Sequence, residues 1–363
     1  MLSRPVSFDS LPGWSDDDHA SAMRAFEKSA SRMRQTPHRT RSLGPSGESL
    51  ARIANWAYHL DEGILGSEAR LFFETHFVPR KVISDPGDHA RRGFVTGYFE
   101  PEVEGSLTRQ GRFQTPLLRR PDDLVEIDRL PAGVALPAGW DETLRFARLV
   151  DGRVEPYFDR PAIEQGAIDI DRHALVYLED PIDAFFIHIQ GSARIRLQDG
   201  EVIRVGFDGK SGHPYSAIGR FLIEEGAVSR EDMSMQAIRT WLTDNRSRQF
   251  ELMWRNRSFI FFRMLEGLSP DDGPVGAAGV QLMTGRSLAV DRMIHTFGVP
   301  IYLNADLDTP FRRLMVAQDT GSAIIGPARG DIFFGSGEAA EIAAGAIKHD
   351  ADFFLLWPKD EPV

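Results

Sequence analysis

Three aspartates near the C-terminal end of the sequence stand beside short apolar runs, where their carboxyl groups could transfer protons. Asp291 and Asp319 each follow a predicted strand, and Asp331 precedes one. Taken singly, each carboxylate is explained by a turn in which it accepts hydrogen bonds from backbone N–H groups. Asp331 differs because Ile332–Phe334 follow it directly, and an apolar neighbourhood raises the pKa of a carboxyl group by desolvation. This pattern predicts that Asp331 is a proton donor at neutral pH.

Two clusters that mix polar and aromatic residues could line a groove for a sugar polymer. They are Thr96–Glu100 (Thr-Gly-Tyr-Phe-Glu) and Ile189–Ser192 (Ile-Gln-Gly-Ser). Aromatic faces pack on sugar rings, and amide side chains form hydrogen bonds with hydroxyl or acetamido groups. For Tyr98 and Phe99 the sequence alone favours a simpler interpretation, as aromatic residues of the core.

Several other chemistries are disfavoured by the sequence. The chain has no cysteine, so it offers no disulfide, no thiolate nucleophile and no cysteine-ligated metal. Its ten histidines never lie within five residues of one another, and we predict neither a metal nor a cofactor. Asp319-Thr320-Gly321 is similar to the active-site turn of an aspartic protease. That chemistry needs two such turns, and the chain carries one.

Composition sets the class of protein. The 363 residues include 42 Lys and Arg against 53 Asp and Glu, a formal net charge of −11. Such a protein has no overall attraction for phosphate backbones, so we expect no nucleic-acid partner. Hydrophobic residues at 42%, with 24 Phe, are enough for a buried core, and the length favours two domains.

Residues 1–14 lack the apolar run of a signal peptide. We expect either a cytosolic protein or an exported one whose signal has been removed.

The predicted elements are mainly short strands with some helices. Helical spacing follows Asp16–Asp18, which lie at the positive end of the predicted helix, and runs to Arg34; it recurs over 67–77, 216–225 and 232–242. Residues 80–92 are expected to form a charged loop. Alternation on both sides of Asp199-Gly200 predicts a β-hairpin with a two-residue primed turn. Further strands are expected in these segments: 93–99, 258–265, 286–290, 300–303, 314–317 and 331–334.

The strands after residue 258 are split by glycines, a pattern typical of a compact β-barrel rather than a βαβ sheet. The middle of the chain mixes hairpins and helices. We therefore predict a barrel domain formed by residues 1–105 and 258–363, and a smaller β-rich domain, residues 106–257, inserted into it.

Many motifs, in order along the chain, resemble the membrane-bound lytic murein transglycosylase A family. The resemblance covers most of the sequence, and its last block also resembles a three-aspartate domain shared with other cell-wall proteins. The motifs are Thr96-Gly97-Tyr98-Phe99-Glu100-Pro101, Phe113-Gln-Thr-Pro116, Tyr157-Phe-Asp-Arg160 with Ile163-Glu164, the block from Asp180 to Ser192, Gly212–Gly219, Gly285–Asp291, Ala317–Gly321 and Gly330–Gly335.

The resemblance implies a double-psi β-barrel with an inserted domain and a groove between them that holds a glycan strand. It implies an exo-acting lytic transglycosylase that cleaves the MurNAc–GlcNAc β-1,4 bond of peptidoglycan without water, leaving 1,6-anhydro-MurNAc ends. By motif position the catalytic aspartate is Asp331, with Asp319 and Asp291 organising the site. The implied substrate-binding residues are Thr96, Gly97, Tyr98, Phe99, Glu100, Gln190, Gly191, Ser192, Tyr215 and Thr320.

The residues themselves leave alternatives open. Asp331 with a second carboxylate as base would make a hydrolytic muramidase or endoglycosidase on the same fold, and a silent site would make a glycan-binding protein. Family members are often outer-membrane lipoproteins with an acylated cysteine, which this sequence lacks. We expect a monomer in the periplasm or cell envelope, with peptidoglycan strands as its partner, and other cell-wall enzymes as further candidates.

Overall fold

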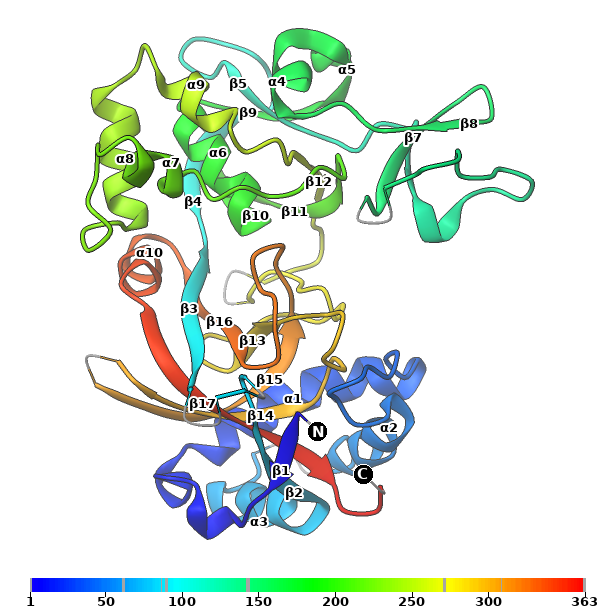
Figure 1. Ribbon diagram of the computed structural model, residues 1–363, viewed down its shortest axis with the longest axis vertical. Helices are drawn as coiled ribbons and strands as arrows, with labels where there is room; N and C mark the ends of the chain where they lie inside the picture. The colour runs from blue at the N-terminus through cyan, green and yellow to red at the C-terminus, as the bar shows by residue number, and fades with distance from the viewer. Residues whose placement is uncertain are drawn as a thin grey trace. The chain divides into compact units, whose positions relative to one another are not determined.

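The computed structural model describes residues 2–60, 63–85, 87–88, 91–141, 144–269, 272–307 and 309–361. The chain divides into two compact units (Figure 1). The first unit combines both ends of the sequence, Met1–Phe99 with Ser269–Val363, and the second is the continuous segment Glu100–Leu268.

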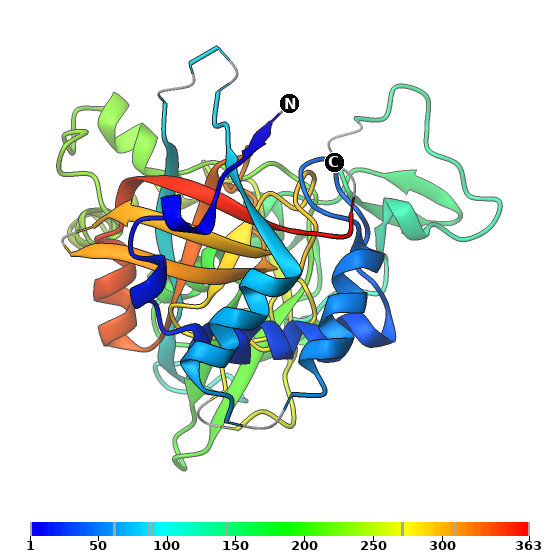
Figure 2. The ribbon, with the colours of Figure 1, turned by 90° about the horizontal axis from the view of Figure 1, so that it is seen from below.

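Helices begin the first unit. Asp18 caps α1 by accepting a hydrogen bond from the Ser21 N–H at 3.0 Å. Helix α1 packs against β15, and α3 packs against β2 (Figures 1 and 2). The elements are β1 (Ser3–Pro5), the 3₁₀ turns η1 (Phe8–Ser10) and η2 (Trp14–Asp16), α1 (His19–Gln35), α2 (Gly47–Ala57) and α3 (Gly66–His76).

The strands of this unit, β1 included, form one sheet that closes on itself. Its order is β1-β2-β17-β14-β15-β13-β16-β3, and β17 also pairs with β3, so six of the strands complete a barrel. This is the predicted mainly β architecture built on a double-psi β-barrel. The elements are β2 (Phe77–Val82), β3 (Gly93–Glu100), β13 (Ser287–Val290), β14 (Pro300–Asp306), β15 (Pro310–Asp319), β16 (Arg329–Ser336), α10 (Glu338–Gly345) and β17 (Lys348–Pro358).

The second unit contains a six-stranded sheet of order β12-β11-β10-β4-β9-β5 and a three-stranded sheet of order β6-β7-β8. Its strands are β4 (Glu102–Ser106), β5 (Thr115–Leu118), β6 (Leu124–Glu126), β7 (Phe146–Val150), β8 (Arg153–Glu155), β9 (Ala174–Leu178), β10 (Ser192–Arg196), β11 (Val202–Lys210) and β12 (Ile260–Met264). Its helical segments are η3 (Ile127–Arg129), α4 (Arg160–Ala162), η4 (Ile163–Ala167), α5 (Ile170–His173), α6 (Pro181–Gln190), α7 (Gly219–Glu224), α8 (Met235–Asp244) and α9 (Gln249–Met253).

The boundaries between the units differ from the expected ones. They fall after Phe99 and after Leu268, rather than after residues 105 and 257. The reason is pairing: β4 hydrogen-bonds to β10, and β12 hydrogen-bonds to β11, so both end strands belong to the second sheet. The predicted groove between two domains stays a prediction.

Three local expectations are corrected. The hairpin turn is a three-residue loop, because Leu197 N–H donates to the Glu201 carbonyl at 2.8 Å and Gly200 takes a φ of 90°. A left-handed glycine in a three-residue loop is the next most common hairpin connection after the primed turns. Residues 80–82 belong to β2 instead of a charged loop. The helices expected over 216–225 and 232–242 are α7 and α8, which begin three residues later at Gly219 and Met235.

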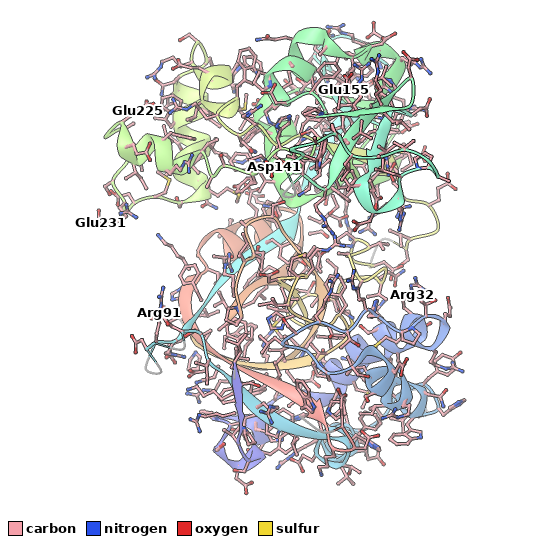
Figure 3. All side chains as sticks on the ribbon, turned by 45° about the vertical axis from the view of Figure 1, so that its right-hand side comes forward. Arg32, Arg91, Asp141, Glu155, Glu225 and Glu231 are labelled. Atoms are coloured by element: carbon pink, nitrogen blue, oxygen red, sulfur yellow. The ribbon has the colours of Figure 1, made fainter. Side chains whose placement is uncertain are left out.

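Each unit has its own hydrophobic core. In the first, Phe26 of α1 contacts Phe73 and Phe77, with ring centroids 5.9 and 6.1 Å away. In the second, separate apolar clusters lie beneath the sheet and around α6. Charged side chains such as Arg91 and Glu231 lie at the periphery of their own units (Figure 3). Among the described residues, no helix has the length and apolarity to cross a membrane.

Candidate active site

The short strand β13 brings two of the three aspartates into one row of the barrel. Ala289 pairs with Asp319 of the parallel strand β15 on one side and with Asp331 of the antiparallel strand β16 on the other. Paired residues point to the same face of a sheet, and neighbouring strands are 4.7–4.9 Å apart, so the two Cα atoms are roughly 10 Å apart on one face. The fold thus places two carboxyl groups, twelve residues apart in sequence, on one surface.

Asp331 accepts a hydrogen bond through one of its two carboxyl oxygens. The Thr96 hydroxyl on β3 donates a 2.6 Å hydrogen bond to Asp331 Oδ1, whereas Oδ2 accepts no hydrogen bond within the described part of the chain. Burial raises the pKa of the Asp331 carboxyl to about 6, against the lowering effects of the Thr96 hydrogen bond and of the Arg329 charge; the charge of Asp319 raises it further. A carboxyl group with this pKa retains a proton to a pH at which an ordinary aspartate is ionised.

Asp319 accepts hydrogen bonds through both of its carboxyl oxygens. Its Oδ1 accepts hydrogen bonds from the N–H groups of Ala277 and Thr320, each at 2.9 Å, and its Oδ2 accepts one from the Tyr98 hydroxyl at 2.9 Å. Burial raises the pKa of Asp319, and these three donors oppose the rise. Burial and the charge of Asp319 raise the pKa of Tyr98 well above its ordinary value, so the phenol stays a donor.

Asp291 has the environment of a turn carboxylate. It is 8% exposed and accepts hydrogen bonds from the N–H groups of Met293 and Gly326, each at 2.9 Å. It thereby joins the turn after β13 to the segment that leads into β16. Thr320, the predicted binding residue next to Asp319, donates its hydroxyl to the Val290 carbonyl at 2.8 Å. Its side chain holds β13 and β15 together.

A buried polar network fixes the end of β15, just before Asp319. The Gln318 amide donates to the Ala25 carbonyl and to the Ser29 hydroxyl of α1, both at 2.8 Å, and its oxygen accepts from the Ser287 hydroxyl. Because Gln318 is fully buried, this network ties the aspartate's strand to α1 and β13.

Glycine is required at one position of the predicted cluster. A Cβ atom on Gly97 would lie 2.8 Å from Ala344 Cα and 2.9 Å from both the Ala344 carbonyl oxygen and Phe334 Cε2. Only a residue without a side chain allows β3 to pass this close to α10 and β16. Gly97 therefore sets the position of its neighbours Thr96 and Tyr98.

Other predicted binding residues have interior side chains. Phe99 is 2% exposed. Glu100 is fully buried in the second unit, where it pairs with Arg194 at 2.8 Å and Arg204 at 2.8 Å. Both face the protein rather than a ligand, and Tyr98 packs on Phe333 with ring centroids 5.3 Å apart.

The remaining predicted residues belong to the second unit. Gln190 ends α6, and Gly191 follows it as the C-cap with a φ of 86°. Ser192 begins β10, and Tyr215 lies, partly exposed, in the segment before α7. None of these four residues belongs to the unit that contains the three aspartates.

Sequence reasoning missed Arg329 and Ala277. Arg329 donates from Nη2 to the Thr96 hydroxyl oxygen at 2.7 Å. Arg329 precedes Asp331 by two residues on β16. Side chains two residues apart in a strand lie on the same face, and this alternation could have indicated Arg329 from the sequence. Ala277 donates to Asp319 through its backbone, a contact that residue type cannot indicate.

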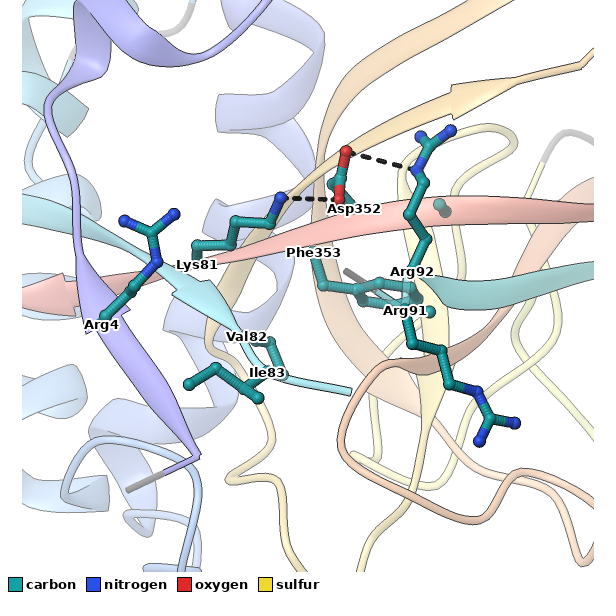
Figure 4. A pocket seen from close by; sticks show the side chains of 10 residues that line it. Arg4, Lys81, Val82, Ile83, Arg91, Arg92, Asp352 and Phe353 are labelled. Atoms are coloured by element: carbon teal, nitrogen blue, oxygen red, sulfur yellow. Dashed lines mark ion pairs between the residues drawn. The ribbon is translucent and has the colours of Figure 1, made fainter. Parts of the chain in front are cut away.

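The described residues contain no group of three or more His, Cys, Asp or Glu arranged to hold a metal ion. The first unit also contains a cavity of about 270 Å³ (Figure 4), and none of Asp291, Asp319 and Asp331 is among the residues that line it. Two of the four cations in its lining pair with the same carboxylate, since Asp352 lies 2.9 Å from Lys81 and 3.4 Å from Arg92.

Comparison with known proteins identifies the family. The sequence model of the MltA specific insert domain matches residues 94–263, and that of the 3D domain matches residues 286–357. A crystal structure of a membrane-bound lytic murein transglycosylase from Agrobacterium tumefaciens is 38% identical with a TM-score of 0.89, over 99% of this chain and 98% of that one. Escherichia coli MltA with bound chitohexaose is 26% identical with a TM-score of 0.67, over 99% and 92% of the two chains.

The membrane-bound lytic murein transglycosylase A of Escherichia coli strain K12 is 34% identical over 271 residues, 72% of this chain. The match spans 64% of the length of that relative. The fold and the motifs define a double-psi β-barrel protein with an inserted domain and a row of barrel carboxylates. The chain belongs to the membrane-bound lytic murein transglycosylase A family.

Proposed function

We propose that this protein is a lytic transglycosylase of the cell envelope that cleaves the MurNAc–GlcNAc β-1,4 bond of peptidoglycan. The observation that carries the proposal is the environment of Asp331. Its pKa is raised to about 6, Thr96 holds one carboxyl oxygen, and the other oxygen accepts no hydrogen bond within the described chain. The names of the relatives, and the chitohexaose bound to one of them, support the same substrate class.

The reaction needs one carboxyl group in two roles. Asp331, protonated, donates to the glycosidic oxygen as the bond from that oxygen to MurNAc C1 breaks, leaving an oxocarbenium-like sugar. The resulting carboxylate takes the proton of the MurNAc C6 hydroxyl as its oxygen bonds to C1, which forms the 1,6-anhydro ring. No water is consumed and Asp331 returns to its acid form. The nucleophile is part of the substrate, so its effective concentration is high.

The contacts of Asp319 favour this reaction over hydrolysis. A hydrolase needs a second carboxylate that is free to activate water or to attack C1. Both oxygens of Asp319 accept hydrogen bonds, from Ala277, Thr320 and Tyr98, and Asp291 joins two loops through Met293 and Gly326. We infer that Asp319 orients Tyr98 and shapes the site, and that Asp291 fixes the surrounding turns.

The test is mass spectrometry of the soluble products released from purified peptidoglycan sacculi. We expect muropeptides one water lighter than hydrolytic products and resistant to borohydride. Asp331→Asn should release none while still binding sacculi, because an amide cannot donate an acidic proton. The control is Asp122→Asn, whose side chain is 94% exposed in the second unit; it should release the wild-type products.

The other outcomes separate the alternatives. Reducible products would make the protein a hydrolase, and binding without any release would make it a glycan-binding protein. Products from Asp331→Asn above a tenth of the wild-type amount would remove Asp331 from the catalytic role. Product lengths over time would test release from strand ends, the mode expected here, against cleavage within strands.

A further inference from the structure

Arg329 lies behind the hydroxyl group that holds the candidate catalytic carboxyl. From β16, its Nη2 donates to Thr96 Oγ1 at 2.7 Å, and its Nη1 donates to the carbonyl oxygen of Gly330. The guanidinium also stacks over the Phe94 ring, with Cζ 5.5 Å from the ring centroid. Three contacts therefore hold this guanidinium group.

This contact sets the direction of the next hydrogen bond. A guanidinium group has only donors, so the Thr96 oxygen must accept from Arg329. A hydroxyl group has one hydrogen, and the remaining neighbour of Thr96 Oγ1 is Asp331 Oδ1 at 2.6 Å. The Thr96 oxygen accepts from Arg329 Nη2, and the Thr96 hydroxyl gives its own hydrogen to Asp331 Oδ1.

We propose that Arg329 is a positioning residue that directs the Thr96 hydroxyl toward Asp331 Oδ1 and so confines the exchangeable proton of Asp331 to Oδ2. Oδ1 already accepts a hydrogen and has little tendency to carry a second one. Oδ2 is then the oxygen that gives the proton to the leaving group and takes it back from the C6 hydroxyl. The assignment of Oδ2 to that reaction rests on the proposed function, whereas the order of the hydrogen bonds does not.

The charges around Asp331 make this arrangement measurable. Arg329 on its own strand and the Thr96 hydroxyl on β3 favour the ionised carboxyl, whereas Asp319 on β15 disfavours it. Tyr98 on β3 also faces Asp331 and is a neutral phenol bonded to Asp319. Strand β13 contributes Ala289, which carries no charge. Arg329 is thus the one cation in this set, and it acts both by its charge and through Thr96.

The experiment follows the titration of the Asp331 carboxyl carbon by ¹³C NMR in the full-length protein, without substrate. Its signal is the one absent from Asp331→Asn. Arg329→Met keeps the length and the contact with Phe94 but has no donor and no charge, and it should raise the midpoint by about one pH unit. Thr96→Val should also raise it. The matched variants Arg329→Lys and Thr96→Ser, which keep the charge and the hydroxyl, should stay closer to wild type.

A double variant distinguishes positioning from a simple charge effect. If Arg329 acts through Thr96, the midpoint of Thr96→Val combined with Arg329→Met shifts by less than the sum of the two single shifts. Additive shifts, or no shift in Arg329→Met, would overturn the proposal. Should Arg329→Met fail to fold, equal midpoints for Thr96→Val and Thr96→Ser would overturn it equally well.

The titration needs no turnover, so the two proposals fail separately. Coupled shifts in a wild-type protein that releases no anhydro products would refute the proposed function and leave the role of Arg329 intact. Anhydro products together with additive shifts would do the reverse. With both intact, the basic limb of the kcat/KM profile, which reports the free enzyme, should move to higher pH in Arg329→Met by the same amount as the NMR midpoint.

Discussion

At the scale of single residues, the Asp331 carboxyl is placed where its ionised form is disfavoured, and this has a cost for stability. Its pKa is about 6 in the folded protein and 3.8 as an ordinary aspartate. As pH rises between these values the unfolded chain loses its proton first, so the free energy of unfolding falls. Below pH 3.8 both states are protonated and the cost is absent.

Replacing Asp331 by Asn should therefore stabilise the protein at high pH. We expect the gain in the free energy of unfolding to be larger at pH 8 than at pH 4.5, by on the order of 2 kcal/mol. Urea denaturation of wild type and variant at both pH values measures it. A gain that is the same at both would mean that the carboxyl titrates normally in the folded state.

Replacing Asp319, in contrast, should destabilise the protein. Asp319→Ala removes the acceptor of the Ala277 and Thr320 N–H groups and of the Tyr98 hydroxyl. We expect a loss of about 2 kcal/mol of stability together with the loss of activity, because buried donors without an acceptor are costly. Thermal melting and product release test this, with Tyr98→Phe as the variant that removes one of the three bonds. Unchanged melting with lost activity would instead make Asp319 a reacting group.

At the scale of secondary-structure elements, strand β3, which carries Thr96 and Tyr98 of the candidate site, depends on contacts that leave no room for a side chain at Gly97. In Gly97→Ala the new Cβ would meet the Ala344 backbone at 2.8 Å, so β3 or α10 must move. We expect a stability loss of about 1–3 kcal/mol and a larger loss of activity, because Thr96 moves with the strand. Gly66→Ala is the control, since its added methyl meets nothing within 4 Å. Equal activity in the two variants would contradict this.

The same elements show how far sequence reasoning reaches. The strands that carry the aspartates were predictable because each contains a short apolar run, and Asp331 stood out because Ile332 follows it. Strand β17 was missed, because its first residues are charged and only its later ones are apolar. Two of the three residues that donate to Asp319, Ala277 and Tyr98, are far from it in sequence. Only the closed sheet brings such segments together, and no local pattern records its register.

At the scale of the whole molecule, the second unit is one continuous segment whose two ends leave the same sheet. Glu102, Arg194 and Arg204 occupy one row across β4, β10 and β11, and Leu265 N–H donates to the Arg204 carbonyl at 2.8 Å. Three strand spacings therefore separate the two ends, about 14 Å. The buried carboxylate of Glu100 pairs with two arginines of this unit, Arg194 and Arg204.

We therefore expect residues 100–268 to fold when expressed alone. The segment contains its own apolar clusters and its own buried ion pairs, so isolation should leave a cooperative thermal transition and dispersed amide signals in NMR. Glu100→Gln in this fragment should lower the melting temperature, because it leaves the charges of the buried Arg204 and the half-buried Arg194 without their carboxylate. A fragment without a cooperative transition would mean that the barrel unit is needed to hold the ends of β4 and β12 in place.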